Sequence, residues 1–168
     1  MDELIRGLVQ YLHVFSGVLW LGGGLYTIFV QTPALTSAPP QSRGPVLAQI
    51  IPRQLNYLLR LGEITILLGV LNVFTSGKAQ LLQELGTSRW AIAILVGAIL
   101  ALLLLGIGHA IIKPSVRKLL ELGPRASSGD TAAGAQAGAI IERLKSVGYA
   151  QVVLGVLIIA AMVVARFS

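Results

Sequence analysis

Long apolar runs separated by short polar stretches dominate the chain. The runs cover about residues 4–30, 56–74, 90–112 and 147–164. A membrane-spanning helix needs about 20 mostly apolar residues, and each run is long enough to form one. The pattern therefore predicts an all-α integral membrane protein, a single domain over residues 1–168, in which four spans pack as a four-helix bundle.

Composition supports a place in the lipid bilayer. Hydrophobic residues make up 55% of the chain and charged residues 12%, whereas a soluble domain carries about 25% charged residues. A soluble monomer would expose large apolar patches, so that class is excluded. Asp2 and Glu3 precede Arg6, and the first apolar run is longer than that of a signal peptide. We therefore expect a membrane helix there.

The distribution of charge predicts the orientation. The chain has 13 Lys and Arg against 7 Asp and Glu, and cytoplasmic connections carry the excess of Lys and Arg. We expect the connections between spans 1 and 2 and between spans 3 and 4 in the cytoplasm, and both termini outside. We interpret this distribution of basic residues as a signal of membrane orientation and do not expect a nucleic-acid partner. The two connections hold Arg43, Arg53, Lys113, Arg117, Lys118, Arg125, Arg143 and Lys145, against Arg6, Lys78, Arg89 and Arg166 on the opposite side.

The connection between the third and fourth spans has an unusual composition. Residues 123–139 are rich in Gly, Ala and Ser, which is typical of a flexible linker. Asp130 within this stretch belongs to the residue types that cap helix N-termini. A cytoplasmic extension of the fourth helix would begin there.

Several chemistries are excluded by missing residues. The chain has no Cys, so it has no disulfides, thiolate zinc sites, cysteine-ligated iron–sulfur clusters or covalent c-type haem. No phosphate-binding glycine loop and no zinc-protease motif occurs, and the Gly22–Gly24 run lies within an apolar span. These absences argue against nucleotide-dependent enzymes and hydrolases and leave enzymatic activity open.

Polar side chains inside a bilayer are costly, so each needs a reason. His13 lies in the outer half of the first span and shares a helix face with Gly17, Trp20 and Gly24. One interpretation is a histidine hydrogen-bonded to a neighbouring helix, with glycines allowing close packing. The other is a haem ligand, with the glycines leaving room for the flat ring.

Two further residues are candidate metal ligands. His109 lies near the cytoplasmic end of the third span, about 20 Å from His13 in depth at 1.5 Å per residue, so these two histidines should not hold the two faces of one haem. Met162 lies near the depth of His13 and follows Gly148 and Gly155 at heptad spacing. It is either a second haem ligand or an apolar filler.

The second span carries two charges. Arg60 and Glu63 are three residues apart and share a helix face, and an ion pair would lower the cost of both inside the membrane. The pair could serve a proton path, or Arg60 could anchor a haem propionate. The structural alternative is a link between the second and third helices near His109.

The first span resembles helix 1 of several bacterial membrane families. Residues Leu12–Gly23 contain a His, a Trp seven positions later and two glycines beyond it, a pattern similar to CopD-type copper-resistance proteins and HemJ-type protoporphyrinogen oxidases. The segment Phe29–Pro33 resembles the membrane domain of PuuD-type urate oxidases. That likeness continues at Pro52, Arg53, Leu55, Arg60, Gly62 and Thr65, and the segment from Trp90 to Pro114 is more similar to the CopD pattern.

The resemblance implies a multi-pass protein of the bacterial cytoplasmic membrane. The HemJ-like pattern places His13 at a haem-binding histidine, and His109 falls near another His-bearing stretch of that family. The CopD-like pattern implies copper handling. PuuD-type proteins have more spans and a cytochrome c tail, which this chain does not contain.

These observations support three hypotheses. In the first, the chain is a b-type haem protein that exchanges electrons with a redox partner. His13 would then be an axial ligand, Gly17, Trp20 and Gly24 would shape the haem pocket, Met162 or His109 would complete the coordination and Arg60 would meet a propionate. In the second, His13, Met162 and His109 are stepping sites for copper. In the third, the chain is an accessory subunit that packs through its glycine faces against other membrane subunits and holds no cofactor.

Overall fold

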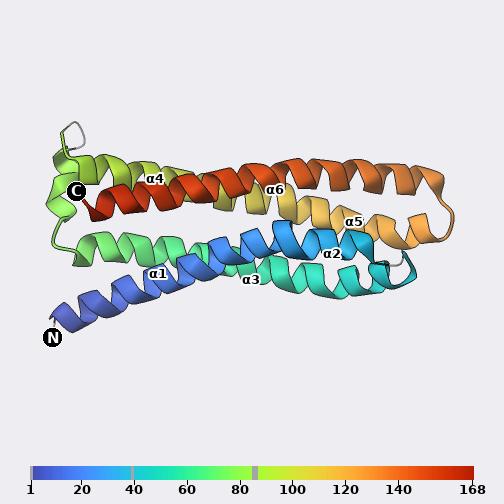
Figure 1. Cartoon of the computed structure of the whole chain (residues 1–168), viewed down its shortest axis with the longest axis horizontal. Helices are drawn as coiled ribbons and strands as arrows, with labels where there is room; N and C mark the ends of the chain where they lie inside the picture. Colours follow the sequence, from blue (N-terminus) through green and yellow to red (C-terminus); the bar gives the residue numbers. More distant parts are fainter. Residues whose placement is uncertain (1, 39, 85–86) are drawn as a thin grey trace.

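The computed structural model describes residues 2–38, 40–84 and 87–168. Four helical rods run side by side along the length of the molecule (Figure 1). The first rod joins α1 (Asp2–Tyr26), a π-helical turn η1 (Thr27–Gln31) and α2 (Thr32–Ser37), and the second is α3 (Pro40–Thr75). After the short 3-10 helix η2 (Ala79–Glu84), the third rod joins α4 (Arg89–Ile107), a π-helical turn η3 (Gly108–Ile112) and α5 (Lys113–Ser127). The fourth rod is α6 (Thr131–Arg166).

The predicted fold class is confirmed. All four rods are long and apolar enough to cross a membrane, and the described residues form helices and turns with no strand. The two termini lie at the same end of the bundle (Figure 1), as four antiparallel spans require. We call this end the terminal end and the opposite one the hairpin end. Which end faces the cytoplasm remains the prediction from charge.

The rods are longer than the predicted spans. The first helix continues to Ser37 and the second begins at Pro40, so the predicted connection between them is mostly helix. Residues 123–139, expected to be a flexible linker, are helical except for the turn at 128–130. That expectation was wrong because small residues also let helices approach closely. Leu122 and Ala133 are 2% and 1% exposed where α5 and α6 pack together.

Asp130 caps α6, as its residue type suggested. Its carboxylate accepts a hydrogen bond from the backbone N–H of Ala133 at 2.9 Å and pairs with the Arg125 guanidinium at 2.7 Å. These two contacts, the backbone bond first, lower the pKa of the Asp130 carboxyl from its ordinary value. Gly129 adopts a φ of +96°, a left-handed conformation that favours glycine. The cap and the glycine end one helix and begin the next within three residues.

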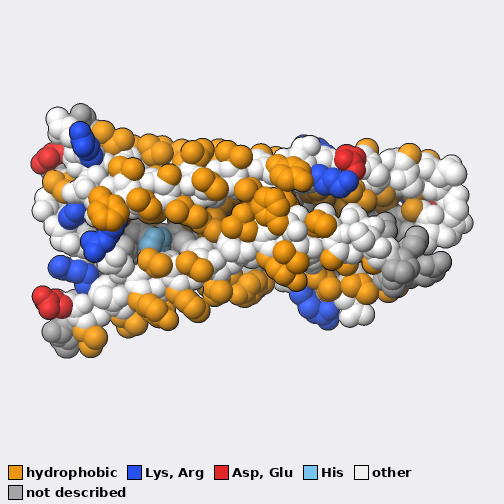
Figure 2. Space-filling model, viewed as in Figure 1, with side chains coloured by type: hydrophobic (Ala, Val, Ile, Leu, Met, Phe, Trp, Pro, Cys, Tyr) orange, Lys and Arg blue, Asp and Glu red, His pale blue; other side chains and the backbone are white. Residues whose placement is uncertain are grey.

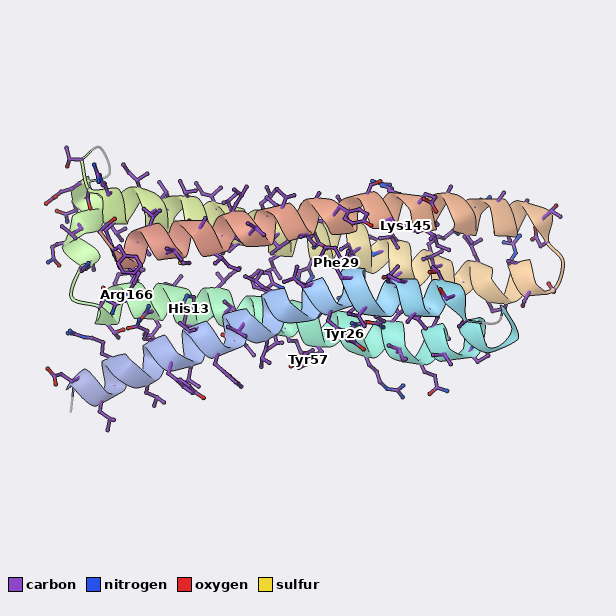
Figure 3. All side chains as sticks on the ribbon, in the orientation of Figure 1. His13, Tyr26, Phe29, Tyr57, Lys145 and Arg166 are labelled. Carbon is purple, nitrogen blue, oxygen red and sulfur yellow. The ribbon has the colours of Figure 1, made fainter. Side chains whose placement is uncertain are left out.

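An apolar belt lies between two groups of charged side chains (Figure 2). Along α4 and the start of η3 the distance from Arg89 to His109 is about 30 Å at 1.5 Å per residue, which is the thickness of the hydrocarbon core of a bilayer. Tyr26, Tyr57 and Lys145 lie at the hairpin-side boundary of this belt, far from Arg166 at the terminal end (Figure 3). Tyrosine and lysine are typical of the membrane–water interface.

The bundle continues beyond that boundary, on the side away from the apolar belt. The helix α5, with 15 residues, adds about 22 Å of length. The helix α2 and the first turns of α3 and α6 accompany it (Figure 1). The Lys and Arg that we assigned to loops on this side therefore lie on helices wherever the structure describes them.

Two helical hairpins make up the membrane part. The helix α1 packs mainly on α3, and α4 packs mainly on α6, while the contact between the two hairpins is smaller. Trp20, Leu104 and Ile158 are buried together and join the hairpins near mid-membrane. At the terminal end a second cluster is formed by Trp90, Ala91, Ala93 and Ala165. Most other large apolar side chains of the spans are exposed, which suits a surface that faces lipid.

Candidate functional site

His13 is held against the neighbouring helix α3. Its Nδ1–H donates a hydrogen bond to the backbone carbonyl oxygen of Thr65 at 2.9 Å. A carbonyl can only accept, so this bond places the proton on Nδ1 and leaves the lone pair on Nε2. This bond is the one expected if His13 is a histidine hydrogen-bonded to a neighbouring helix. It is also the arrangement in which metal-binding histidines donate their other ring N–H to a carbonyl and ligate through the free nitrogen.

Two side-chain rings of α1 pack directly on two glycines of α3. A Cβ added at Gly69 would lie 2.9 Å from Cε1 of His13, and one added at Gly62 would lie 2.7 Å from Cε2 of Trp20. His13 and Trp20 are seven residues apart, as are Gly62 and Gly69. Because α1 and α3 run antiparallel, both rings meet a glycine at the same time. The position of the imidazole therefore depends on the absence of a side chain at Gly69.

The His13 side chain lies in a hollow near the terminal end. Figure 2 shows a histidine at the floor of a recess between the two hairpins, and Figure 3 labels His13 at that place. Arg6 lies seven residues before His13, on the same face of α1 and about 10 Å along its axis. The Arg6 guanidinium lies close to the turn at Gly77, whose added Cβ would be 3.7 Å from its Nη2. A cation therefore lies between the hollow and the membrane surface.

The other predicted glycines of the first span have different roles. A Cβ added at Gly17 would lie 3.5 Å from Cγ2 of Thr65, and one added at Gly24 would meet nothing within 4 Å. Gly17 thus belongs to the contact between α1 and α3 beside His13. Gly24 faces open space, and it is Gly23 whose added Cβ would lie 2.5 Å from Leu58. Gly24 therefore makes no close contact with a neighbouring helix, and its role in leaving room for a haem ring stays a prediction.

Glu63 pairs with His109 and not with Arg60. The His109 Nε2 lies 3.0 Å from Glu63 Oε1, and the two side chains are 41% and 47% exposed. This contact joins α3 to η3 near His109, as the structural alternative expected, but the predicted buried pair of Arg60 and Glu63 does not form because His109 Nε2 is the partner of Glu63. Arg60 is exposed and forms no ion pair within the described part of the chain. It lies nine residues from Gly69, about 14 Å toward the hairpin end.

Met162 packs within the second hairpin. An added Cβ at Gly97 of α4 would meet the terminal methyl group of Met162, and the side chain borders the cluster around Trp20. Its contacts are those of an apolar filler.

His109 and His13 are well separated along the bundle. Gly108, next to His109, faces Leu59, whereas His13 faces Gly69. These positions of α3 are ten residues apart, or about 15 Å. The three predicted ligands His13, His109 and Met162 thus lie in three separate contacts. Residues 2–38, 40–84 and 87–168 contain no group of three or more His, Cys, Asp or Glu that could hold a metal ion.

Sequence reasoning missed the residues that position His13. Thr65 provides the acceptor, Gly69 provides the space and Arg6 provides the nearby charge. A signal for them exists: Gly62, Thr65 and Gly69 form a small-residue stripe at helical spacing, and Arg6 precedes His13 by two turns. Only the antiparallel register of α1 and α3 shows that this stripe faces His13.

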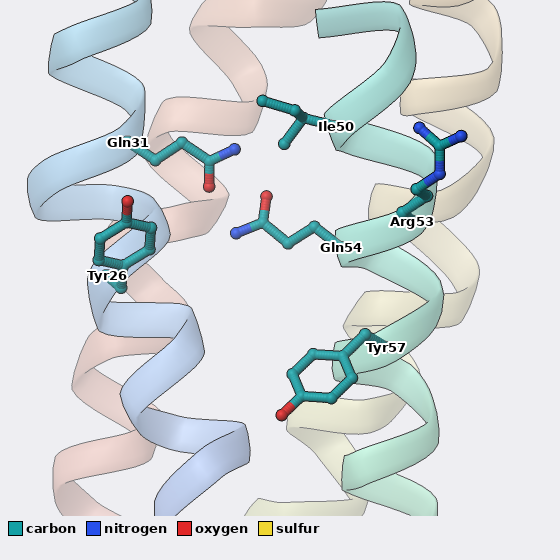
Figure 4. Close-up of a pocket in the computed structure, with 6 residues that line it drawn as sticks. All are labelled: Tyr26, Gln31, Ile50, Arg53, Gln54 and Tyr57. Carbon is teal, nitrogen blue, oxygen red and sulfur yellow. The ribbon is translucent and has the colours of Figure 1, made fainter.

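A second concave region lies at the hairpin-side boundary, between η1 and α3. It has a volume of about 430 Å³ and contains two tyrosines, two glutamines, an isoleucine and an arginine (Figure 4): Tyr26, Gln31, Ile50, Arg53, Gln54 and Tyr57. The adjoining groove, of about 370 Å³, shares Tyr26, Gln54 and Tyr57 with it and is otherwise apolar. Gln31 and Arg53 fall within the segments that resemble PuuD-type proteins. No sequence pattern brought them together, because they lie on consecutive rods that meet only when the rods pair.

The chain matches no family model, no curated protein and no solved structure. The resemblance to the CopD, HemJ and PuuD patterns stays a prediction from short motifs.

Proposed function

We propose that this chain is a small multi-pass membrane protein that binds haem b through Nε2 of His13 and takes part in electron transfer. The observation that supports the proposal is the hydrogen bond from His13 Nδ1–H to the Thr65 carbonyl oxygen, which leaves Nε2 able to ligate a metal. When bound, haem supplies a one-electron ferric–ferrous couple. The protein would orient the imidazole through Thr65 and set the local charge through Arg6.

The residues around His13 fit a flat, anionic, largely apolar group. The hollow lies within the apolar belt and near its terminal end (Figure 2), so a macrocycle in it would be surrounded by hydrocarbon and apolar side chains. Arg6 lies about 10 Å from His13 along α1, closer to the membrane surface. We assign Arg6, in place of Arg60, as the cation for a propionate, because Arg60 lies toward the other end of the bundle.

Visible spectroscopy tests this proposal directly. The protein is purified in mild detergent after expression with ample haem, and spectra are recorded in the oxidised and dithionite-reduced states. We expect a Soret band and reduced α and β bands that disappear in His13→Ala. The variants His109→Ala and Met162→Leu serve as matched controls and should keep the bands, since His109 contacts Glu63 and Met162 contacts Gly97, whereas His13 contacts Thr65 and Gly69. A flat spectrum from protein of normal helical content by circular dichroism would falsify the proposal.

A second candidate function is that of a subunit in a larger membrane complex. The Glu63–His109 pair is the observation in its favour, because both side chains are more than two-fifths exposed. Glu63 also lies six residues, or about 9 Å, inside the level of Tyr57 on α3, where polar groups are costly unless a partner covers them. Purification in mild detergent should then yield a defined complex in the absence of haem. A Glu63→Leu, His109→Leu double variant should dissociate that complex. A complex that survives this change would argue against this interface.

A further inference from the structure

We propose that the region between η1 and α3 binds the head group of an isoprenoid quinone, with the isoprenoid chain in the adjoining apolar groove. This site is independent of His13 and of haem. It is assigned from the cavities, their depth in the membrane and the hydrogen-bonding groups that face them.

The two cavities form one groove whose polarity changes along its length. The head region, of about 430 Å³, has the size range of small-molecule sites. The tail region continues from it toward the terminal end and is lined apart from the shared residues by Val18, Leu19, Gly22, Gly23 and Leu58. The groove therefore suits an amphipathic molecule with a polar ring and an apolar chain.

The depth of the groove matches such a molecule in a bilayer. Tyr57 lies 18 residues from Thr75 along α3, which is about 27 Å and close to the thickness of the hydrocarbon core. Gln54 lies one turn farther out, at the level of the lipid head groups. Val18 lies eight residues from Tyr26, so the tail region reaches about 12 Å into the hydrocarbon. A lipid can enter sideways from the membrane because Tyr26 and Tyr57 are both exposed.

The hydrogen-bonding groups at the head region are neutral. The side-chain amides of Gln31 and Gln54 point toward each other across the gap, and the Tyr57 ring points into it (Figure 4). The Gln54 amide donates to Thr27 Oγ1 at 2.8 Å. The Gln31 Oε1 is buried and has no hydrogen-bond partner among the described residues. A buried acceptor without a donor is destabilising, so a hydroxyl that reached it would stabilise the site.

Two neutral amides can serve both redox forms of a quinone. In the drawn orientation Gln31 offers an oxygen to a quinol hydroxyl. A half-turn of its amide would instead offer an N–H donor to a quinone carbonyl. The aromatic rings of Tyr26 and Tyr57 border the same space (Figure 4), and aromatic rings pack favourably on a flat head group.

A π-helical turn borders this gap. The π-helical turn η1 begins directly after Tyr26, and such turns insert a residue into an α-helix and often occur at functional sites. The Thr32 hydroxyl donates to the Thr27 carbonyl oxygen at 2.7 Å, which helps to satisfy the altered backbone. At Gly22 a Cβ would meet nothing within 4 Å, so the tail region is open along α1.

An anionic phospholipid fits this site less well than a quinone. The only cation that lines the described head region is Arg53, whose Nη1 donates to the Gln49 carbonyl oxygen at 3.0 Å. Its guanidinium points along α3 away from the gap (Figure 4). A phosphate in the gap would therefore lack a facing charge, whereas a neutral ring would not need one.

Titration with decylubiquinone tests the assignment. The purified protein in detergent is titrated while its tryptophan fluorescence is followed, and we expect saturable quenching. Gln31→Leu should weaken binding by about tenfold, the effect of losing one hydrogen bond in a desolvated site. Gly22→Leu should abolish binding by filling the tail region. Gly24→Leu adds the same volume outside the groove lining and should bind like the wild type.

Two further arms separate this proposal from its alternatives. The titration is repeated with His13→Ala, which should bind the quinone normally, so that loss of haem and loss of quinone are distinguishable. A competing titration uses micelles of phosphatidylglycerol. Quinone affinities equal among wild type, Gln31→Leu and Gly22→Leu, with all three proteins folded, would overturn the proposal. Displacement of the quinone by phosphatidylglycerol at equal concentration would also overturn it and assign the groove to phospholipid.

Discussion

The Gly69→Ala variant is the sharpest probe of the His13 site. The added Cβ would lie 2.9 Å from Cε1 and 3.3 Å from Nδ1 of His13, whereas carbon atoms in contact lie about 3.5–4.0 Å apart. The ring must therefore move by about 0.6–1 Å. The hydrogen bond from Nδ1 to Thr65 starts at 2.9 Å, so a movement of this size takes it to the limit at which such bonds fail.

The expected cost follows from these distances. Overpacking costs about 1–3 kcal/mol, and loss of the hydrogen bond adds about 0.5–1.5 kcal/mol. The better helix propensity of alanine returns about 1 kcal/mol. The net destabilisation is on the order of 1–3 kcal/mol, and the imidazole loses the orientation that leaves Nε2 free. Haem content per protein should therefore fall more than helical content does.

Two glycine variants provide matched controls. Gly62→Ala places a methyl group 2.7 Å from the Trp20 ring, so it should destabilise the bundle by a similar amount while leaving His13 in place and the haem bands intact. Gly24→Ala meets nothing within 4 Å, so it should leave the haem bands unchanged and raise stability by about 1 kcal/mol through helix propensity. Stability is measured by thermal unfolding in detergent and haem by the reduced Soret band. Haem loss equal in Gly62→Ala and Gly69→Ala would refute the reasoning, because the effect would then come from general instability.

Three further predictions test other parts of the structure. Because the chain has no cysteine, a membrane-impermeant thiol reagent added to intact cells should label Ser168→Cys and leave Ser128→Cys unlabelled; the reverse pattern would invert the orientation. The cap at Asp130 should protect the first amides of α6 from hydrogen exchange. Since the pKa of the Asp130 carboxyl is lowered from 3.8, this protection should be complete above that pH and be lost as the pH falls through the lower folded-state pKa. Asp130→Ala should lack both the protection and its pH dependence. Equal protection in the two proteins would contradict the cap. In a double-mutant cycle, Glu63→Ala and His109→Ala should show a coupling of about 0.6 kcal/mol, a typical value for polar contacts between membrane helices, and strict additivity would show that the pair does not hold α3 to η3.

Much of the fold follows from local patterns. The four apolar runs predicted the four rods, and Asp130 predicted where α6 begins. The prediction for residues 123–139 was wrong because composition alone does not distinguish a flexible linker from a tightly packed helix of small residues. What separates the two is the partner surface: α5 and α6 cover each other's small side chains, and this tertiary packing supplies most of the stability of the helices.

The site shows the same division between local and tertiary information. His13 was recognisable from the sequence because a histidine in an apolar span needs a reason. The groove at Gln31 and Gln54 was not, since its parts are separated by the turn between two rods and meet only when those rods pair. The partner of Glu63 was also misassigned: helical spacing allowed Arg60, and the contact between α3 and η3 brought His109 instead.

The sequence by itself determined that the chain has four helices able to span a membrane. This property depends only on the length and hydrophobicity of each run of residues. The tertiary structure decided which atoms face each other. The antiparallel register of α1 and α3 set His13 on Gly69 and Trp20 on Gly62, and it directed the Nδ1 proton to Thr65. That register depends on the fit of many side chains at once, so no single helix contains the information to specify it.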